Sequence, residues 1–178
     1  MKFLCVLVLG LIATLTFSHS SMAKTTEADA SLLWQFSRFK DHVTAVDTAQ
    51  LIYGIPETDA VMVMAICNAG NDGEVSLSLS ANVTVSDKAK VSARIFGTAI
   101  DAMAIIPESG EGLAGFGVNL PAHDPLLAKM LSKPGLTYGL KDGAQRTIPL
   151  SKGKAPIKKF IQACKSFAAL KHAGKTKP

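Results

Sequence analysis

Four lysines lie close together where a long helix is predicted to begin: Lys152, Lys154, Lys158 and Lys159. The first turn of a helix presents unpaired backbone N–H groups and a partial positive charge, so cations placed there gain nothing for folding. A bound phosphate, sulfate or carboxylate would reverse that balance. The lysines therefore predict an anion-binding surface. The alternative is a solvated cationic face that aids solubility.

Positive charge is concentrated at the C-terminal end of the chain. Residues 24–142 carry 9 basic and 14 acidic side chains, whereas residues 143–178 carry 9 basic and no acidic ones. Lysines without arginine forks or interleaved aromatic side chains attract phosphate non-specifically and do not read bases. We therefore expect an acidic protein, an acidic polysaccharide or an anionic lipid surface as the partner, in preference to nucleic acid.

Two cysteines fall at positions that are expected to face the protein interior. Cys67 lies on the inward face of a predicted strand, and Cys164 lies in the middle of the apolar face of the predicted last helix. A third cysteine, Cys5, belongs to a segment that is predicted to be removed. Because pairing is the default in an oxidising compartment, we predict a Cys67–Cys164 disulfide that joins helix to sheet. The alternative is two separately buried thiols.

The first 23 residues have the organisation of a signal peptide. Lys2 precedes an apolar run over residues 3–17, and Ser21 and Ala23 occupy the small-residue positions that a signal peptidase reads. The run is shorter than the roughly 20 residues that a membrane-spanning helix needs. We therefore predict cleavage before Lys24 and a periplasmic or secreted mature protein without a transmembrane segment.

A glycine motif and a search for nucleophiles give no catalytic centre. Gly110, Gly112 and Gly115 match the G-x-G-x-x-G spelling of a dinucleotide site, but the residues that follow alternate like a strand and do not open a helix. We interpret the motif as a loop between strands. The sequence contains no G-x-S-x-G nucleophile elbow, and pairing of the cysteines would remove a nucleophilic thiol.

Titratable residues elsewhere lack the spacing that metal binding or acid–base catalysis requires. No partner at a metal-ligand spacing accompanies the histidines of the predicted mature chain, which are His42, His123 and His172. The carboxylate pairs Glu57–Asp59 and Glu108–Glu111 lie in predicted turns, so solvated turn acids explain them better than an acid–base pair or calcium ligands. We predict no catalytic residue, no metal site and no cofactor.

The residues above must be positioned by a β-rich domain, because apolar and polar residues alternate along much of the chain. In residues 75–80, for example, every second residue is a serine, which describes a strand with one buried face. In residues 60–67 both faces are apolar, so that strand is expected to be covered on both sides. The predicted strands span residues 33–38, 50–55, 60–67, 75–80, 91–95, 99–106, 115–120, 136–140 and 145–150.

Two predicted helices interrupt the strands, which tight Asp-Gly turns otherwise pair in antiparallel fashion. Asp124 caps a short helix over residues 126–131, and Pro125 occupies its first position. Pro156 opens a longer helix whose apolar face is formed by Ile157, Phe160, Ile161, Cys164, Phe167 and Ala168.

The predicted fold class is mainly β (α+β). We expect an antiparallel β-sandwich or twisted sheet with a short internal helix and a C-terminal helix stapled by the disulfide. Residues 24–172 form the single predicted domain, and residues 173–178 form a flexible basic tail.

Several segments resemble small, largely uncharacterised exported bacterial proteins. The resemblance lies in residues 51–59, in a strand reaching Cys67, and in a closing strand at residues 147–150 that leads into residues 160–164. The ending is also similar to that of the invasion-associated locus B family, whose members are secreted β-rich domains. The resemblance implies a compartment and a fold, and it assigns no functional residue.

The sequence thus predicts an exported, non-enzymatic binding module that acts at the cell envelope or in the extracellular space. Its basic C-terminal helix is the expected contact for an anionic partner. Two alternatives stay open: an enzyme with a site assembled from scattered residues, and a structural envelope component. A deep pocket with convergent titratable groups would favour the enzyme, whereas an exposed apolar strand edge or a basic face would favour the binding module.

Overall fold

The computed structural model describes residues 32–108 and 112–174, which form one sheet of nine strands and two α-helices. The strands are β1 (Leu33–Lys40), β2 (Asp47–Gly54), β3 (Val61–Asn68), β4 (Val75–Ser80), β5 (Lys90–Ile95), β6 (Thr98–Ile105), β7 (Gly115–Leu120), β8 (Gly135–Leu140) and β9 (Arg146–Pro149). The helices are α1 (Pro125–Ser132) and α2 (Lys154–Gly174), and two short 3₁₀ turns are η2 (Ala69–Asn71) and η3 (Ser151–Gly153).

Some predictions concern segments at the two ends of the chain. The predicted signal peptide at residues 1–23 lies outside the described residues, as do residues 175–178 of the predicted tail. Residues 173 and 174, which the sequence analysis assigned to the tail, belong to α2. None of the described helices is both long and apolar enough to cross a membrane.

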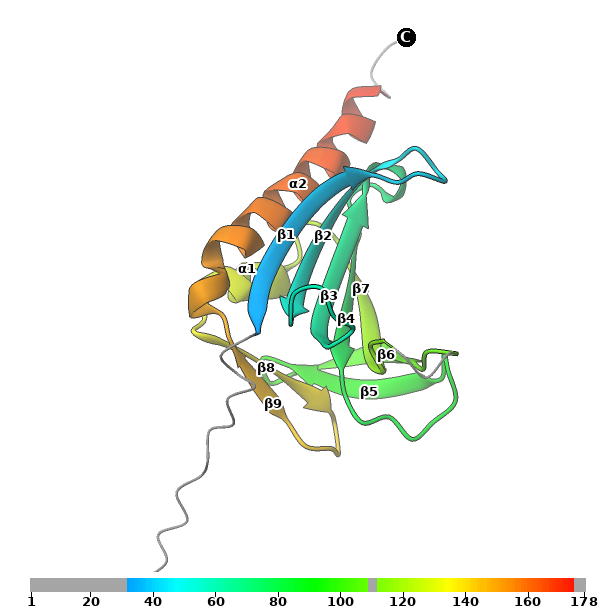
Figure 1. Ribbon diagram of the computed structural model, residues 1–178, viewed down its shortest axis with the longest axis vertical. Helices are drawn as coiled ribbons and strands as arrows, with labels where there is room; N and C mark the ends of the chain where they lie inside the picture. Colours follow the sequence, from blue (N-terminus) through cyan, green and yellow to red (C-terminus); the bar gives the residue numbers. More distant parts are fainter. Residues whose placement is uncertain (1–31, 109–111, 175–178) are drawn as a thin grey trace, which may run out of the picture.

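The sheet is strongly curled. Figure 1 shows β1 to β4 running steeply beside α2, whereas β5, β8 and β9 cross below them. The strand order is β1-β2-β3-β4-β7-β6-β5-β8-β9, and every pairing is antiparallel. The predicted mainly β fold is confirmed. Of the two predicted arrangements, the chain adopts the single twisted sheet.

Most strands pair with their neighbour in the sequence, and the two exceptions determine the shape of the sheet. The meander of β5, β6 and β7 returns to the free side of β4, which gives the β4–β7 pair. The connection through α1 then carries the chain from β7 to the far side of β5, which gives the β5–β8 pair. As a result, β1 and β9 are the two edge strands of the sheet.

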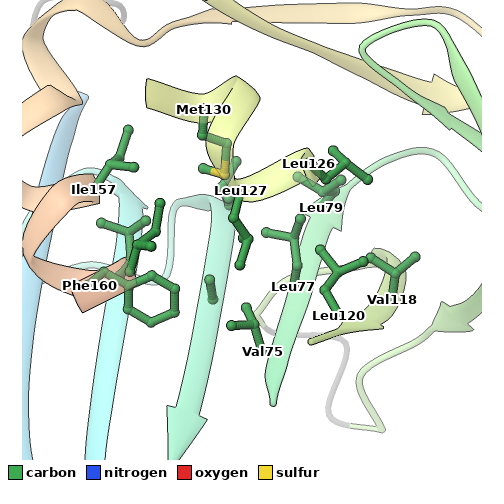
Figure 2. Close-up of a cluster of buried hydrophobic side chains, with 14 of the residues drawn as sticks. Val75, Leu77, Leu79, Val118, Leu120, Leu126, Leu127, Met130, Ile157 and Phe160 are labelled. Atoms are coloured by element: carbon green, nitrogen blue, oxygen red, sulfur yellow. The ribbon is translucent and has the colours of Figure 1, made fainter. Parts of the chain in front are cut away.

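The core lies between one face of the sheet and the two helices. Figure 2 shows buried side chains of β4, β7, α1 and α2 meeting there: Val75, Leu77, Leu79, Val118, Leu120, Leu126, Leu127, Met130, Ile157 and Phe160. The predicted apolar face of the last helix is confirmed, since Ile157, Phe160 and Phe167 are all buried. Each such side chain contributes about 1.5–3 kcal/mol through burial.

The strand β3 is covered on one face only. Val63, Ala65 and Cys67 are buried against the helices, as predicted. Met62, Met64 and Ile66 on the other face are half-buried, so the prediction of cover on both sides is wrong. Both described helices pack on the inner face, and the apolar residues of the outer face are shielded in part by neighbouring strands.

The predicted disulfide between Cys67 and Cys164 is confirmed, with 5.7 Å between the two Cα atoms. Both cysteines are buried, so the bond ties the middle of α2 to the end of β3 inside the core. The turn after β3 closes on the same place. Gly73 has a φ of +68°, and a β-carbon on it would collide with the Cys164 carbonyl oxygen, so this turn requires glycine for both space and backbone angle.

Candidate functional site

Three of the four lysines predicted to bind an anion are exposed. Lys152 lies in η3, and Lys158 and Lys159 follow one another on α2. Successive residues of an α-helix are about 100° apart around its axis, so Lys158 and Lys159 point to different flanks. Lys159 lines a hollow beside β1, and Lys158 is not part of that lining. Of the four lysines, Lys159 alone lines this hollow.

Lys154 has a structural partner of its own. Its ammonium Nζ donates to the carbonyl oxygen of Met130 at 3.1 Å and to that of Lys133 at 2.6 Å. These carbonyls belong to the C-terminal end of α1, where a cation is favourable because the helix dipole is negative there. The sequence argument that a cation at this position gains nothing for folding is therefore wrong for Lys154.

The exposed flank of α2 that carries Lys159 faces β1 across a shallow hollow of about 330 Å³. We call it the basic hollow, and it is lined by Phe36, Arg38, Lys159, Gln162, Ala163 and Ser166. Two of these residues are cations and none is acidic. Within the described residues, neither Arg38 nor Lys159 forms an ion pair. Their charge is therefore available to a ligand.

Arg38 is held against α2 by an aromatic ring. Its guanidinium carbon lies 5.0 Å from the ring centre of Phe167, a buried residue of that helix. An arginine in this position gains cation–π energy of about 0.5–1 kcal/mol and loses side-chain freedom. The contact therefore restricts one cation of the basic hollow, and the exposed Lys159 supplies a second cation from the helix.

Arg38 is not among the residues that the sequence predicts to bind an anion. The alternation of residues 33–38 places Arg38 on the same face as Trp34 and Phe36, which is the inner face in the structure. A cation on an otherwise apolar strand face is unusual, and it indicates that the side chain interacts with a partner. Its closeness to Lys159 depends on the docking of α2 beside β1, which no local pattern reveals.

A larger groove lies on the outer face of the sheet, over β4, β7, β6 and β5. Its volume is about 800 Å³, and its lining combines serines with apolar side chains, among them Ser76, Ser78, Ser92, Met103 and Ile105. Its charged residues are two lysines and two aspartates, Lys88, Lys90, Asp87 and Asp101. Because these charges balance, the groove does not select an ion by net charge.

The glycine motif lies at the beginning of a strand. Gly115 opens β7, and a β-carbon there would collide with the backbone of Leu79 in the paired strand β4. Close approach of the two strands therefore accounts for Gly115. The motif has a structural role at a connection between strands, as predicted. Gly112 lies in the preceding connection with a φ of +95°, and Gly110 lies outside the described residues.

The other titratable candidates are found in turns. His42 and His123 are exposed, as are Glu57, Asp59 and Glu108. The side chains of His172 and Glu111 lie outside the described residues. Over residues 32–108 and 112–174, no group of three His, Cys, Asp or Glu side chains is placed to hold a metal ion.

His123 directly precedes Asp124, whose carboxylate accepts a hydrogen bond from the Leu126 N–H at 2.7 Å and caps α1 as predicted.

Comparisons with known proteins give one weak structural likeness. No family model matches the chain, and no curated protein matches it. The fold is similar to the crystal structure of invasion-associated protein B from Bartonella henselae, with a TM-score of 0.42 and 13% sequence identity. The match covers 74% of this chain and 97% of that chain. The likeness is weak, and it is to the same family whose ending the C-terminal segments of the sequence resemble.

Proposed function

We propose that the protein is an exported, non-enzymatic binding module that takes an anionic partner at the cell envelope or in the extracellular space. The contact surface is the basic hollow, to which α2 contributes the exposed Lys159. One observation carries the proposal: Arg38 and Lys159, which come from opposite ends of the chain, line one hollow without an acidic side chain among them.

The lining of the basic hollow favours binding over bond-breaking chemistry. Its one hydroxyl, on Ser166, donates to the Ala163 carbonyl oxygen at 2.7 Å. A serine nucleophile needs a neighbouring base to accept its proton, and the lining contains neither a histidine nor a carboxylate. Cations and the Gln162 amide are groups that hold an anion by charge and hydrogen bonds.

Export is supported by the N-terminal sequence and by the disulfide. The run of residues 3–17 and the small residues before Lys24 fit a cleaved signal peptide. Disulfides such as Cys67–Cys164 persist in oxidising compartments. Intact mass of the protein recovered from its native compartment tests this part. A chain beginning at Lys24 is expected, and a species that retains Met1 would contradict export by cleavage.

The anion proposal is tested by binding to heparin, used as a model polyanion. The variant Arg38→Gln/Lys159→Gln should leave a heparin column at lower salt than the wild type, because it has lost two cations that attract the polyanion. Salt weakens such attraction, since surface charges are screened over about 10 Å at 0.1 M salt. The matched control is Lys90→Gln/Lys141→Gln, which removes the same charge from exposed residues of β5 and the β8–β9 turn. Equal shifts for both variants would show that net charge alone drives binding.

A folding control accompanies this test, because Arg38 also contacts Phe167. The single variant Lys159→Gln changes only an exposed side chain, so it should keep the melting temperature of the wild type and still elute early. A wild-type protein that binds neither heparin nor acidic peptides at low salt would overturn the proposal.

A further inference from the structure

We infer that the anionic partner is an acidic polypeptide segment that binds as an additional strand along the free edge of β1. This inference rests on the proposed function, because it uses the same basic hollow, and it adds the class of partner. Within the described residues, β1 pairs with β2 alone and so has one unpaired edge. An exposed edge of this kind is a template for strand addition.

The backbone groups at the free edge follow from the turn that joins β1 to β2. The Asp41 N–H donates to the Val46 carbonyl oxygen at 2.9 Å, so Asp41 faces β2. Backbone groups of successive residues alternate between the two sides of an antiparallel strand, and the β1–β2 pairing continues without a register shift. The N–H and C=O groups of Phe36, Arg38 and Lys40 therefore point to the free edge.

The start of β1 is less accessible than the rest of the strand. Trp34 packs against η3, since a β-carbon on Gly153 would lie 2.5 Å from the Trp34 Cδ1 atom. The edge available to a partner therefore runs from Phe36 to Lys40. Its exposed residues include Phe39, with 42% of its surface accessible, on the sheet face that α2 does not cover.

The free edge and the basic hollow are next to one another. Phe36 and Arg38 have their backbone groups on the edge and their side chains in the lining of the hollow. Every second side chain of an added strand lies on the same sheet face, so one of them would enter the hollow. A glutamate or aspartate there meets Arg38, Lys159 and the Gln162 amide.

The positive charge beside the free edge of β1 favours an acidic strand over a second copy of this chain. Pairing of β1 with β1 of a second copy would bring the Arg38 and Lys40 side chains of both strands together, and like charges on adjacent strands are unfavourable. Asp47 is the β2 partner of Lys40, so the positive charge is centred on Arg38 and Lys159. A polysaccharide or lipid headgroup would use these cations and leave the edge N–H and C=O groups in water. An acidic strand uses both.

A short blocked peptide of alternating glutamate and valine is the probe for this inference. The control is the same peptide with every backbone nitrogen methylated, which keeps the charges and removes the strand hydrogen bonds. The unmodified peptide should bind at least about tenfold more tightly, because the methylated control cannot donate the backbone hydrogen bonds of an added strand. Binding should also slow hydrogen exchange of the Arg38 and Lys40 amides.

The possible outcomes separate this inference from the proposed function. Tighter binding of the unmodified peptide, slower exchange of the Arg38 amide, and weaker binding to Lys159→Gln but not to Lys141→Gln would support both. Equal binding of the two peptides, or binding of heparin alone, would overturn strand addition and leave anion binding intact. Failure of both the peptide and heparin to bind would overturn both.

Discussion

The indole N–H of Trp34 donates to the carbonyl oxygen of Pro149 at 2.8 Å. Trp34 lies on β1 and Pro149 on β9, which are the first and last strands in the order of the sheet. A side chain therefore joins the two edges that the backbone leaves unpaired, and the curled sheet is closed at this end. The lone tryptophan of the chain also packs on Tyr53, with 4.9 Å between ring centres.

The contact between Trp34 and η3 predicts a coupled pair of substitutions. Gly153→Ala should lower the free energy of unfolding by about 1–3 kcal/mol, because the new methyl group overlaps the indole ring. In a Trp34→Ala background the same substitution should cost much less, since the ring is gone. A double-mutant cycle from urea unfolding measures this coupling. Additive costs would mean that Trp34 does not occupy the space above Gly153.

The disulfide should be a major source of stability. Replacing Cys67 and Cys164 together by alanine should lower the free energy of unfolding by about 2–5 kcal/mol, since the bond closes a sequence separation of 97 residues. Chemical denaturation of the oxidised protein and the double variant measures the difference. Wild-type protein unfolded with a reductant should approach the variant. Equal midpoints for oxidised protein and variant would show that α2 docks without the bond.

Lys154 should stabilise the fold through α1. Lys154→Met removes a charged donor from the carbonyl oxygens of Met130 and Lys133, which should cost about 1–3 kcal/mol. Lys158→Met changes an exposed residue one turn further along α2 and should lie within about 0.5 kcal/mol of the wild type. Urea unfolding of both variants compares them. A cost for Lys158→Met as large as that for Lys154→Met would refute the capping role.

Stability should fall at alkaline pH because of Tyr138. Burial raises the pKa of this side chain above its ordinary value of 10.0, although Ser80 and Arg146 act to lower it. In the unfolded chain the tyrosine ionises near pH 10, so unfolding releases a proton at higher pH and is favoured as pH rises. The melting temperature of the wild type should therefore drop more steeply above about pH 10 than that of Tyr138→Phe. Parallel curves would contradict the raised pKa.

The elements of the fold could be predicted because they depend on local periodicity. Alternation with a period of two marks the strands, and the spacing of Ile157, Phe160 and Phe167 marks the buried face of α2. The order of the strands could not be predicted, because the β4–β7 and β5–β8 pairs join segments with no turn between them. The open outer face of β3 was missed for a related reason. Apolar residues such as Met62 and Met64 do not indicate on which face of the strand the helices pack.

The candidate site could be predicted only in part. Lys159 could be identified from charge, because it lies in residues 143–178, which contain 9 basic and no acidic side chains. Arg38 and Lys154 depend on tertiary contacts: one meets α2 through Phe167, and the other meets the end of α1. The sequence groups the four lysines in one cluster, whereas docking of α1 and α2 gives Lys154 a structural role and gives Lys159 an arginine neighbour.

The position of α2 after all nine described strands in the sequence constrains the order of folding. The inner faces of β1 and β2 are covered by this helix, and its residues are the last described ones to be synthesised. The first strands can form their hairpins early, but their apolar inner faces stay in water until residue 167 is available. Contacts of such long sequence separation form slowly. A nascent or truncated chain that lacks α2 is therefore expected to bind chaperones or aggregate, and the completed chain to escape both.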